Sequence, residues 1–325
     1  MTTTRCGSTT ARQLFSNGLL VAAAVMAVMT TPRAVAAPPP KRLAIYYGFP
    51  SLVNGARGDV DKAAATFAAY DVVVFGDGLE YDTPPPGRPG AGAVEHRRTA
   101  AIIERLGTLN PSLRVFGYVT LGMGAHLDAA TVDDAIARWK VTGAHGIFFD
   151  EAGSDFGVTP DRLGFALSAA RRRDMAVFVN AFNPDDVVGG EGLRRGDLYL
   201  LESFAVRNGL RDDDRHGVDR ARRAAAHARE SGVEVWAVTT AGDGTFDPAL
   251  CRYAWQAAAT LNFAGFGWGE PHYSAPNSLL PFRSCETAPA SPARSGGQAR
   301  AVAPPGQPVV GLAIGGEELL LRKAG

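Results

Sequence analysis

The chain has 325 residues, of which 46% are hydrophobic and 20% charged, and its 33 basic side chains balance 33 acidic ones to give a formal net charge of zero. These values are typical of a soluble globular protein and exclude a disulfide-rich miniprotein, a coiled coil and a mostly disordered chain. The balanced charge also argues against nucleic acids and anionic membranes as partners, because both are bound by an excess of clustered Lys and Arg.

The first 36 residues have the order of a secretory signal peptide. Arg5 and Arg12 precede an apolar run over residues 19–29, and small residues follow up to Ala34-Val35-Ala36. An apolar run of 11 residues is too short to span a bilayer, and the small residues form an A-x-A cleavage site. We therefore expect residues 1–36 to be removed on export. The mature protein is then secreted and is not inserted into a membrane.

Eight short apolar runs alternate with helical stretches between residues 41 and 285. The runs cover residues 43–49, 71–77, 113–121, 145–151, 175–182, 197–203, 233–240 and 263–270. Runs that are apolar throughout indicate strands that are buried on both faces, as in a parallel sheet covered by helices.

Signals for helix starts and ends stand between these runs. Residues 131–134 can cap a helix that ends at Gly143, and Thr159-Pro160 can begin the next helix. Eight βα units in about 240 residues fit a single (β/α)8 TIM barrel of the α/β class. The alternative is an open doubly wound sheet, for which we expect a Gly-rich phosphate loop after the first strand. Residues 46–50, Tyr-Tyr-Gly-Phe-Pro, do not form such a loop.

The end of the chain differs in composition from the barrel region. Residues 286–325 are rich in Ala, Pro, Ser and Gly and mostly lack apolar periodicity, so we expect a flexible tail. Removal of the signal peptide takes Cys6 with it and leaves Cys251 and Cys285. In an exported chain these two residues form either one disulfide or two free thiols, and the sequence leaves both possibilities open.

Polar side chains, most of them acidic, close the predicted strands. The active site of a TIM barrel lies at the C-terminal ends of its strands, so these residues are the first candidates for function. They are Asp77, Asp150, Glu151, Asn180, Glu202 and Glu270. A carboxylate at the end of a buried apolar run is costly to desolvate unless it is paired, which indicates that these carboxylates have a functional role.

Aromatic side chains accumulate near the same strand ends. They are Tyr46, Tyr47, Tyr81, Tyr118, Trp236, Trp268 and Tyr273. Aromatic faces with acidic groups between them suit a neutral or cationic sugar, although a single aromatic residue more often serves packing. As substrate-binding residues we expect Tyr47, Asp77, Tyr118, Asn180, Trp236, Trp268 and Glu270.

The acidic residues also suggest a reaction. Glycoside cleavage needs two carboxyl groups that flank the scissile bond. Asp150 and Glu202 end the fourth and sixth strands, so they can face each other across the barrel mouth. Our first hypothesis is a retaining glycosidase with Asp150 as nucleophile and Glu202 as general acid/base. Glu151 points to the opposite face of the strand from Asp150, so it can hold a neighbouring group in place.

Four segments of the chain resemble known glycoside hydrolases. The block Gly-Ile-Phe-Phe-Asp-Glu at residues 146–151, with residues 116–119, 178–180 and 201–203, is similar to the spherulin-4-like and polygalactosaminidase-like families 114 and 135. The resemblance covers most of residues 43–283. It implies a (β/α)8 barrel that cleaves α-1,4 linkages in galactosamine-containing exopolysaccharide. It also implies that the catalytic carboxylates are Asp150, with Glu151 beside it, and Glu202.

Two other functions are compatible with the same residues. Asp150, Asn180 and Glu202 close three successive strands and could bind Mg²⁺ through their oxygen atoms, as in a metal-dependent barrel enzyme. A carbohydrate-binding barrel without catalysis would keep the aromatic residues but lack correctly spaced acids. We favour the glycosidase, which needs no cofactor and no metal. We expect a polysaccharide as its partner and a monomer as its state.

Overall fold

The computed structural model describes residues 38–285, apart from 86–87, 89, 126, 190–191, 243–244 and 283–284. The predicted signal peptide (1–36) and C-terminal tail (286–325) lie outside the described residues. In the part of the chain that is described, no helix combines the length and the apolar character that crossing a membrane would require.

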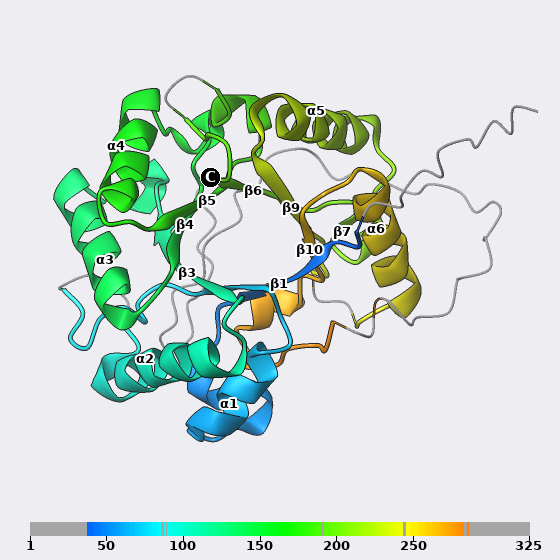
Figure 1. Cartoon of the computed structure of the whole chain (residues 1–325). Helices are drawn as coiled ribbons and strands as arrows, with labels where there is room; N and C mark the ends of the chain where they lie inside the picture. The colour runs from blue at the N-terminus through cyan, green and yellow to red at the C-terminus, as the bar shows by residue number, and fades with distance from the viewer. Residues whose placement is uncertain are drawn as a thin grey trace, which may run out of the picture. The chain divides into compact units, whose positions relative to one another are not determined.

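Eight parallel strands close into a barrel in the order β1-β10-β9-β6-β5-β4-β3-β2 (Figure 1). They are β1 (Lys41–Tyr46), β2 (Val72–Phe75), β3 (Arg114–Thr120), β4 (Gly146–Asp150), β5 (Ala176–Asn180), β6 (Leu198–Leu201), β9 (Glu234–Val238) and β10 (Gly265–Gly267). The ring is closed because β1 pairs with β2 on one side and with β10 on the other. The prediction of a single (β/α)8 TIM barrel is confirmed.

The α-helices surround the barrel (Figure 1). They are α1 (Val60–Phe67), α2 (Gly92–Leu109), α3 (Ala129–Thr142), α4 (Pro160–Arg171), α5 (Arg215–Ser231) and α6 (Pro248–Thr260). The start of α4 is as predicted, because the Thr159 side chain accepts a hydrogen bond from the Arg162 N–H and Pro160 is the first helical residue. Gly143 follows α3 with a φ of 98°, which agrees with its predicted role as a helix stop.

Short elements take the place of helices at some connections. The 3₁₀ turns are η1 (Pro50–Gly55), η2 (Met123–Ala125), η3 (Ser154–Phe156), η4 (Pro184–Asp186) and η5 (Pro271–Ser274), and a small hairpin joins β7 (Val206–Arg207) to β8 (Leu210–Arg211). As far as residues 181–197 are described, η4 rather than an α-helix links β5 to β6. The segment contains Gly189 and Gly196, both with positive φ, which do not favour a helix here.

The core has two layers, which explains why the strands have continuous apolar sequences. One layer lies between the strands and the helices and includes Phe149 and Trp139. The other fills the barrel and includes Phe116, Phe148 and Phe178. Because neighbouring residues of a strand point to opposite faces, Phe148 packs inside the barrel and Phe149 packs outside it.

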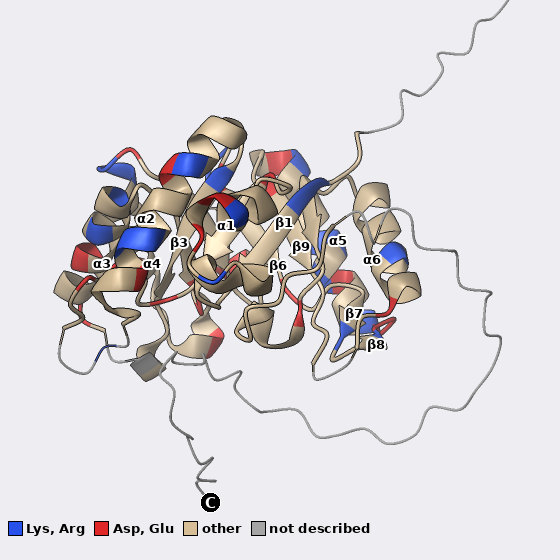
Figure 2. Cartoon of the chain, turned by 90° about the horizontal axis from the view of Figure 1, so that it is seen from below, with Lys and Arg blue, Asp and Glu red and all other residues tan. Residues whose placement is uncertain are grey.

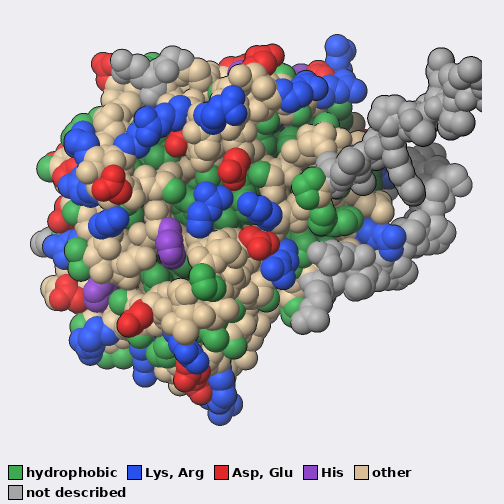
Figure 3. Space-filling view, viewed as in Figure 1, with side chains coloured by type: hydrophobic (Ala, Val, Ile, Leu, Met, Phe, Trp, Pro, Cys, Tyr) green, Lys and Arg blue, Asp and Glu red, His purple; other side chains and the backbone are tan. Residues whose placement is uncertain are grey.

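Charged side chains of both signs are distributed over the outside of the barrel. In Figure 2, residues of both signs occur on the helices and loops, and in Figure 3 they are interspersed on the face that is shown. This distribution is in keeping with the balanced composition of the chain.

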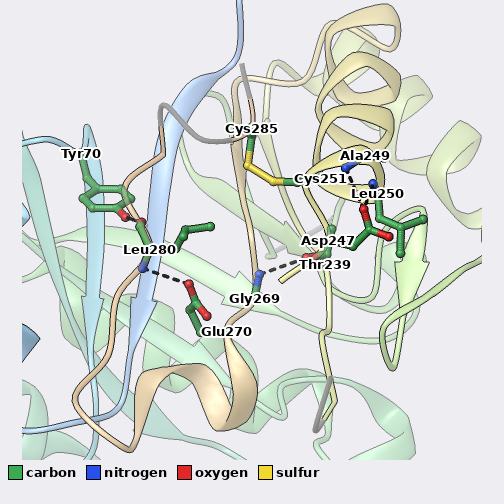
Figure 4. Close-up of a disulfide and its surroundings, with 10 residues drawn as sticks. All are labelled: Tyr70, Thr239, Asp247, Ala249, Leu250, Cys251, Gly269, Glu270, Leu280 and Cys285. Carbon is green, nitrogen blue, oxygen red and sulfur yellow. Dashed lines mark hydrogen bonds between the residues drawn. A yellow bond between two sulfur atoms is a disulfide. The ribbon is translucent and has the colours of Figure 1, made fainter. Parts of the chain in front are cut away.

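The segment that follows β10 is tied to the barrel at several points (Figure 4). Cys285 forms a disulfide with Cys251 in α6, which answers the question that the sequence left open. The Glu270 carboxylate accepts a hydrogen bond from the Leu280 N–H at 2.9 Å, and the Tyr70 hydroxyl donates to the Leu280 carbonyl. The chain is thus held to the barrel beyond its last strand.

We expect loss of this disulfide to destabilise the barrel. The two cysteines are 34 residues apart, and the chain-entropy relation for a loop of this size gives about 3–4 kcal/mol. The free energy of unfolding of the Cys251→Ser/Cys285→Ser double variant, measured by urea denaturation, should be lower by about this amount. Dithiothreitol should lower the stability of the wild type to the same level and leave the double variant unchanged. Equal stability of the two proteins would contradict the prediction.

Candidate active site

Three polar side chains end three neighbouring strands on the inner face of the barrel. Asp150 is the last residue of β4, Asn180 is the last residue of β5, and Glu202 directly follows β6. Each stands two residues after an apolar residue of the inner layer, namely Phe148, Phe178 and Leu200. Because side chains alternate along a strand, the three polar groups continue the inward-facing series at the barrel mouth.

The amide of Asn180 joins the two carboxylates. Its nitrogen Nδ2 donates to Asp150 Oδ1 at 2.8 Å and to Glu202 Oε2 at 3.2 Å. These two oxygens are therefore no more than 6.0 Å apart, the sum of the two donor–acceptor distances. If the bonds follow the two amide hydrogens, which diverge by roughly 120°, the separation is about 5 Å. The structure thus brings together the two acids and the amide that the sequence placed at three strand ends.

Asp150 is held in an environment that disfavours its charge. Burial, and secondarily the charge of Glu202, raises the pKa of Asp150 to about 7, although the hydrogen bonds from Asn180 and the Glu151 N–H oppose this shift. Both bonds end on Oδ1, at 2.8 Å and 2.9 Å. Among the contacts of the described residues, Oδ2 accepts none, so this oxygen can carry a proton toward a ligand in the mouth.

Glu202 accepts a hydrogen bond at each oxygen. Asn180 donates to Oε2, and the hydroxyl of Tyr273, from η5, donates to Oε1. The guanidinium of Arg220, on α5, donates to the backbone carbonyl of Glu202 and also lies 4.6 Å from the ring centre of Phe182. The carboxylate of Glu202 is thus held by donors from two elements, while Arg220 fixes its backbone.

Glu151 turns away from the pair. Its φ is +53°, and its Oε2 accepts a hydrogen bond from the Thr120 hydroxyl at 3.0 Å. Gly122 leaves room for this carboxyl group, because a Cβ atom there would lie 2.2 Å from Oε2. The side chain predicted as a third catalytic group therefore contacts the end of β3, and Glu151 contributes to the pair through its backbone N–H.

Three tyrosines pack beside the carboxylates. Tyr47, which follows β1, contacts the rings of Tyr118 and Tyr273, each with ring centres 5.4 Å apart. Burial raises the pKa of all three hydroxyls well above the usual value, and the negative charges of nearby carboxylates add to this effect. The hydroxyls therefore stay protonated and serve as donors. Tyr47 and Tyr118 were predicted at this place, whereas Tyr273 was only noted as one of the aromatic residues.

Asp77 lies close enough to Tyr47 and Tyr118 for its negative charge to contribute to the raised pKa of their hydroxyls. Its Oδ1 accepts a hydrogen bond from Arg88 Nη2 at 2.9 Å, and the same nitrogen lies 3.6 Å from Glu80. Burial and the charge of Asp77 raise the pKa of Glu80 to about 8. Burial also raises the pKa of Asp77, although the charge of Arg88 opposes this shift. Asp77 is thus a neighbour of the site that shares Arg88 with a second acid.

Three residues that we expected to bind substrate lie apart from this group of side chains. Trp236 is fully buried inside the barrel, because it lies in the middle of β9 rather than at its end. Trp268 is 8% exposed and packs in the outer layer against Phe246. Glu270 holds the backbone of Leu280 (Figure 4).

The ligand geometry at the mouth suits proton transfer better than cation binding. The nitrogen of Asn180 faces both carboxylates, whereas a metal would need the amide oxygen there. Within the described ranges, no group of three or more His, Cys, Asp and Glu side chains is arranged to hold a metal ion.

Comparisons with known proteins gave matches among solved structures, all at low sequence identity. No protein-family model matches the chain. No curated protein matches it either. Among solved structures, the glycoside hydrolase domain of PelA from Pseudomonas aeruginosa is similar at 13% identity and a TM-score of 0.48, over 72% of this chain and 96% of that domain.

Two further solved structures are similar at about the same level. A GH10 endoxylanase from a sugarcane soil metagenome has 10% identity and a TM-score of 0.47, over 71% of this chain and 86% of its own. Malate synthase from Haloferax volcanii has 14% identity and a TM-score of 0.47, over 81% of this chain and 75% of its own. Likenesses at this level say nothing about the reaction, which has to be argued from the side chains.

The electrostatics of the pair predict an unusual titration of Asp150. In protein with ¹³C-labelled Asp, the carboxyl resonance that disappears in Asp150→Asn should titrate near pH 7, with Asp150 protonated below this pH and ionised above it. Glu202→Gln removes a neighbouring negative charge and should lower the midpoint by about 1–2 pH units. Asn180→Ala removes a hydrogen bond to the ionised form and should raise the midpoint.

Glu270→Gln is the matched control, because Glu270 is also partly buried but does not contribute to the shift of Asp150. This variant should leave the titration of Asp150 unchanged. A midpoint near pH 4 in the wild type would show that the pair is not coupled as described.

Proposed function

We propose that the protein is a secreted glycoside hydrolase that cleaves α-1,4 linkages in galactosamine-containing exopolysaccharide with retention of configuration. The observation that carries the glycosidase proposal is the pair of carboxylates, Asp150 and Glu202, bridged by the Asn180 amide. The substrate class rests on the resemblance of residues 146–151 and the strand ends around them to the polygalactosaminidase-like families.

The separation of the carboxylates supports retention. Retaining glycosidases have carboxyl groups about 5–5.5 Å apart, whereas inverting enzymes leave roughly 6.5–9.5 Å so that a water molecule fits between the carboxylate that acts as general base and the sugar. The facing oxygens of Asp150 and Glu202 are at most 6.0 Å apart. This distance favours direct attack by one carboxylate on the anomeric carbon.

The contacts favour the reverse of the roles suggested by the sequence. Both oxygens of Glu202 accept hydrogen bonds, which fix the orientation of the carboxylate as attack on the anomeric carbon requires. Asp150 has a raised pKa and an oxygen, Oδ2, without a hydrogen-bond partner in the described part of the chain. We therefore assign Glu202 as the nucleophile and Asp150 as the general acid/base.

The reaction then proceeds in two steps. Glu202 attacks the anomeric carbon while Asp150 gives its proton to the leaving glycosidic oxygen, which forms a covalent glycosyl ester on Glu202. Asp150, now ionised, removes a proton from water as that water attacks the anomeric carbon, and the bond to Glu202 breaks. Tyr47 and Tyr118 offer buried hydroxyl donors and ring faces beside the sugar.

One observation supports export of the enzyme. The disulfide between Cys251 and Cys285 is the kind of bond that persists in oxidising compartments, which agrees with the signal peptide proposed for residues 1–36. We also propose that the enzyme acts as a monomer on its polysaccharide.

Removal of either carboxyl group should abolish most of the activity. We expect Asp150→Asn and Glu202→Gln to reduce the hydrolysis of partially acetylated α-1,4-galactosamine polymers by about 10²–10⁴-fold or more, since each removes a group that transfers a proton or forms the covalent bond. Mass spectrometry of the products reports cleavage, and NMR of the first product reports its anomeric configuration.

Glu104→Gln is the control, because Glu104 is exposed on α2 and lies outside the site. It should retain the wild-type rate. Hydrolysis by both carboxyl variants at that rate would remove the proposal. Polymer binding by the wild type without release of any product would instead favour a carbohydrate-binding barrel.

The two roles can be distinguished by chemical rescue. Azide should restore turnover of an activated aryl glycoside by Glu202→Ala and give a glycosyl azide of inverted configuration, because azide replaces the nucleophile. With Asp150→Ala, azide should attack the glycosyl ester on Glu202 and give a product of retained configuration. The opposite pattern would return the nucleophile to Asp150 and the acid to Glu202.

A further inference from the structure

We propose that Tyr273 is a positioning residue that holds the Glu202 carboxylate ready for attack through its phenol hydroxyl, and that the left-handed backbone of residues 272–274 exists to place this hydroxyl. The inference rests on the proposed function, because it gives Glu202 the role of nucleophile. It concerns a residue that strand-end reasoning did not assign to the site.

Tyr273 and Asn180 donate hydrogen bonds to different oxygens of the Glu202 carboxylate. The Tyr273 hydroxyl donates to Oε1, and the Asn180 amide donates to Oε2. The two donors belong to different elements, η5 and β5, so together they fix the rotation of the carboxylate. A carboxylate held at both oxygens loses little freedom when it attacks, which is the geometric requirement for a nucleophile in a retaining enzyme.

The ring of Tyr273 is fixed by Tyr47. The ring centres are 5.4 Å apart, and the Tyr47 N–H donates to the Tyr273 carbonyl at 2.7 Å. The Tyr273 N–H in turn donates to the Glu270 carbonyl at 2.9 Å. Side chain and backbone are thus held together, so the position of the hydroxyl is set by the end of β1 as well as by η5.

The backbone around Tyr273 is strained. His272, Tyr273 and Ser274 have φ values of 50°, 49° and 64°, and non-glycine residues seldom adopt this left-handed region, least of all three in succession. Strain of this kind persists only where the surroundings enforce it, and it is concentrated at functional sites.

The loop after β1 supplies this support. Asn277 Oδ1 accepts hydrogen bonds from the Phe49 N–H at 2.7 Å and the Tyr46 hydroxyl at 3.3 Å. Gly48 permits the close approach, because a Cβ atom there would lie 2.7 Å from the Ser274 carbonyl oxygen and 2.5 Å from Asn277 Oδ1. The strained segment therefore rests directly against β1 and its loop.

The charged and titratable groups around Glu202 determine what loss of the hydroxyl does. Asp150 faces it from β4, Tyr47 from the end of β1, Tyr273 from η5, and Arg220 from α5, where it bonds the Glu202 backbone. Without the Tyr273 hydroxyl, Oε1 loses its hydrogen-bond donor, and Asn180 still donates to Oε2. The carboxylate can then rotate away from the position for attack, so the first chemical step slows.

The test is Tyr273→Phe, which keeps the ring and removes only the hydroxyl. We expect kcat to fall about 10- to 100-fold, the range for a hydrogen bond to a charged group, while KM changes less than about threefold. The melting temperature should stay close to that of the wild type. Tyr253→Phe removes a hydroxyl that bonds Asp213 at the surface and should change none of these values.

A second measurement does not depend on activity. In protein with ¹³C-labelled Glu, the carboxyl resonance that disappears in Glu202→Gln should have a different chemical shift in Tyr273→Phe than in the wild type at the same pH, because the carboxylate loses a hydrogen bond at Oε1. If the wild type hydrolyses no polymer, the proposed function fails, but the resonance still tests the contact. Unchanged kinetics and an unchanged resonance in Tyr273→Phe would overturn the inference.

Discussion

One amide group, at the end of β5, stands between two carboxylates that repel each other. At a separation of about 5 Å and an effective dielectric constant of 20, two full negative charges repel by about 3 kcal/mol. The barrel mouth relieves this repulsion in two ways. Asn180 donates to both groups, and Asp150 takes up a proton more readily than an ordinary carboxyl group. A pair of carboxyl groups that holds one proton contains one acid and one base, and glycoside cleavage needs both groups.

The closed barrel makes this pairing geometrically unavoidable. β4, β5 and β6 are hydrogen-bonded neighbours, so the residues that continue their inner faces emerge at the same edge. The chain then turns sharply behind each acid, because the residue after Asp150 and the residue after Glu202 both have left-handed φ values, +53° at Glu151 and +54° at Ser203. These turns lead the backbone away from the mouth, and at Glu151 the turn also directs the backbone N–H to Asp150. Local strain is therefore placed where it orients the carboxylates.

The sequence predicted the parts of the structure that depend on strand periodicity. Continuous apolar runs require two buried faces, hence a barrel, and alternation within a strand placed Asp150, Asn180 and Glu202 on one rim. Periodicity does not show how far along a strand a side chain lies, and Trp236 is therefore in the middle of β9 rather than at its end. It also does not predict loops. Tyr273 reaches Glu202 through a left-handed turn that depends on Tyr47, 226 positions earlier in the chain, and no local pattern carries that information.

The segment that carries Tyr273 runs from the site to the disulfide between Cys251 and Cys285. It leaves β10 through η5, is held at Leu280 by Glu270 and Tyr70, and ends at the disulfide between Cys285 and Cys251. A strained turn between two firm anchors cannot relax by drifting away from the barrel, so the anchors maintain the contact with Glu202. The disulfide forms only where thiols are oxidised. Under the proposed export, the segment that carries Tyr273 would gain its covalent anchor in an oxidising compartment.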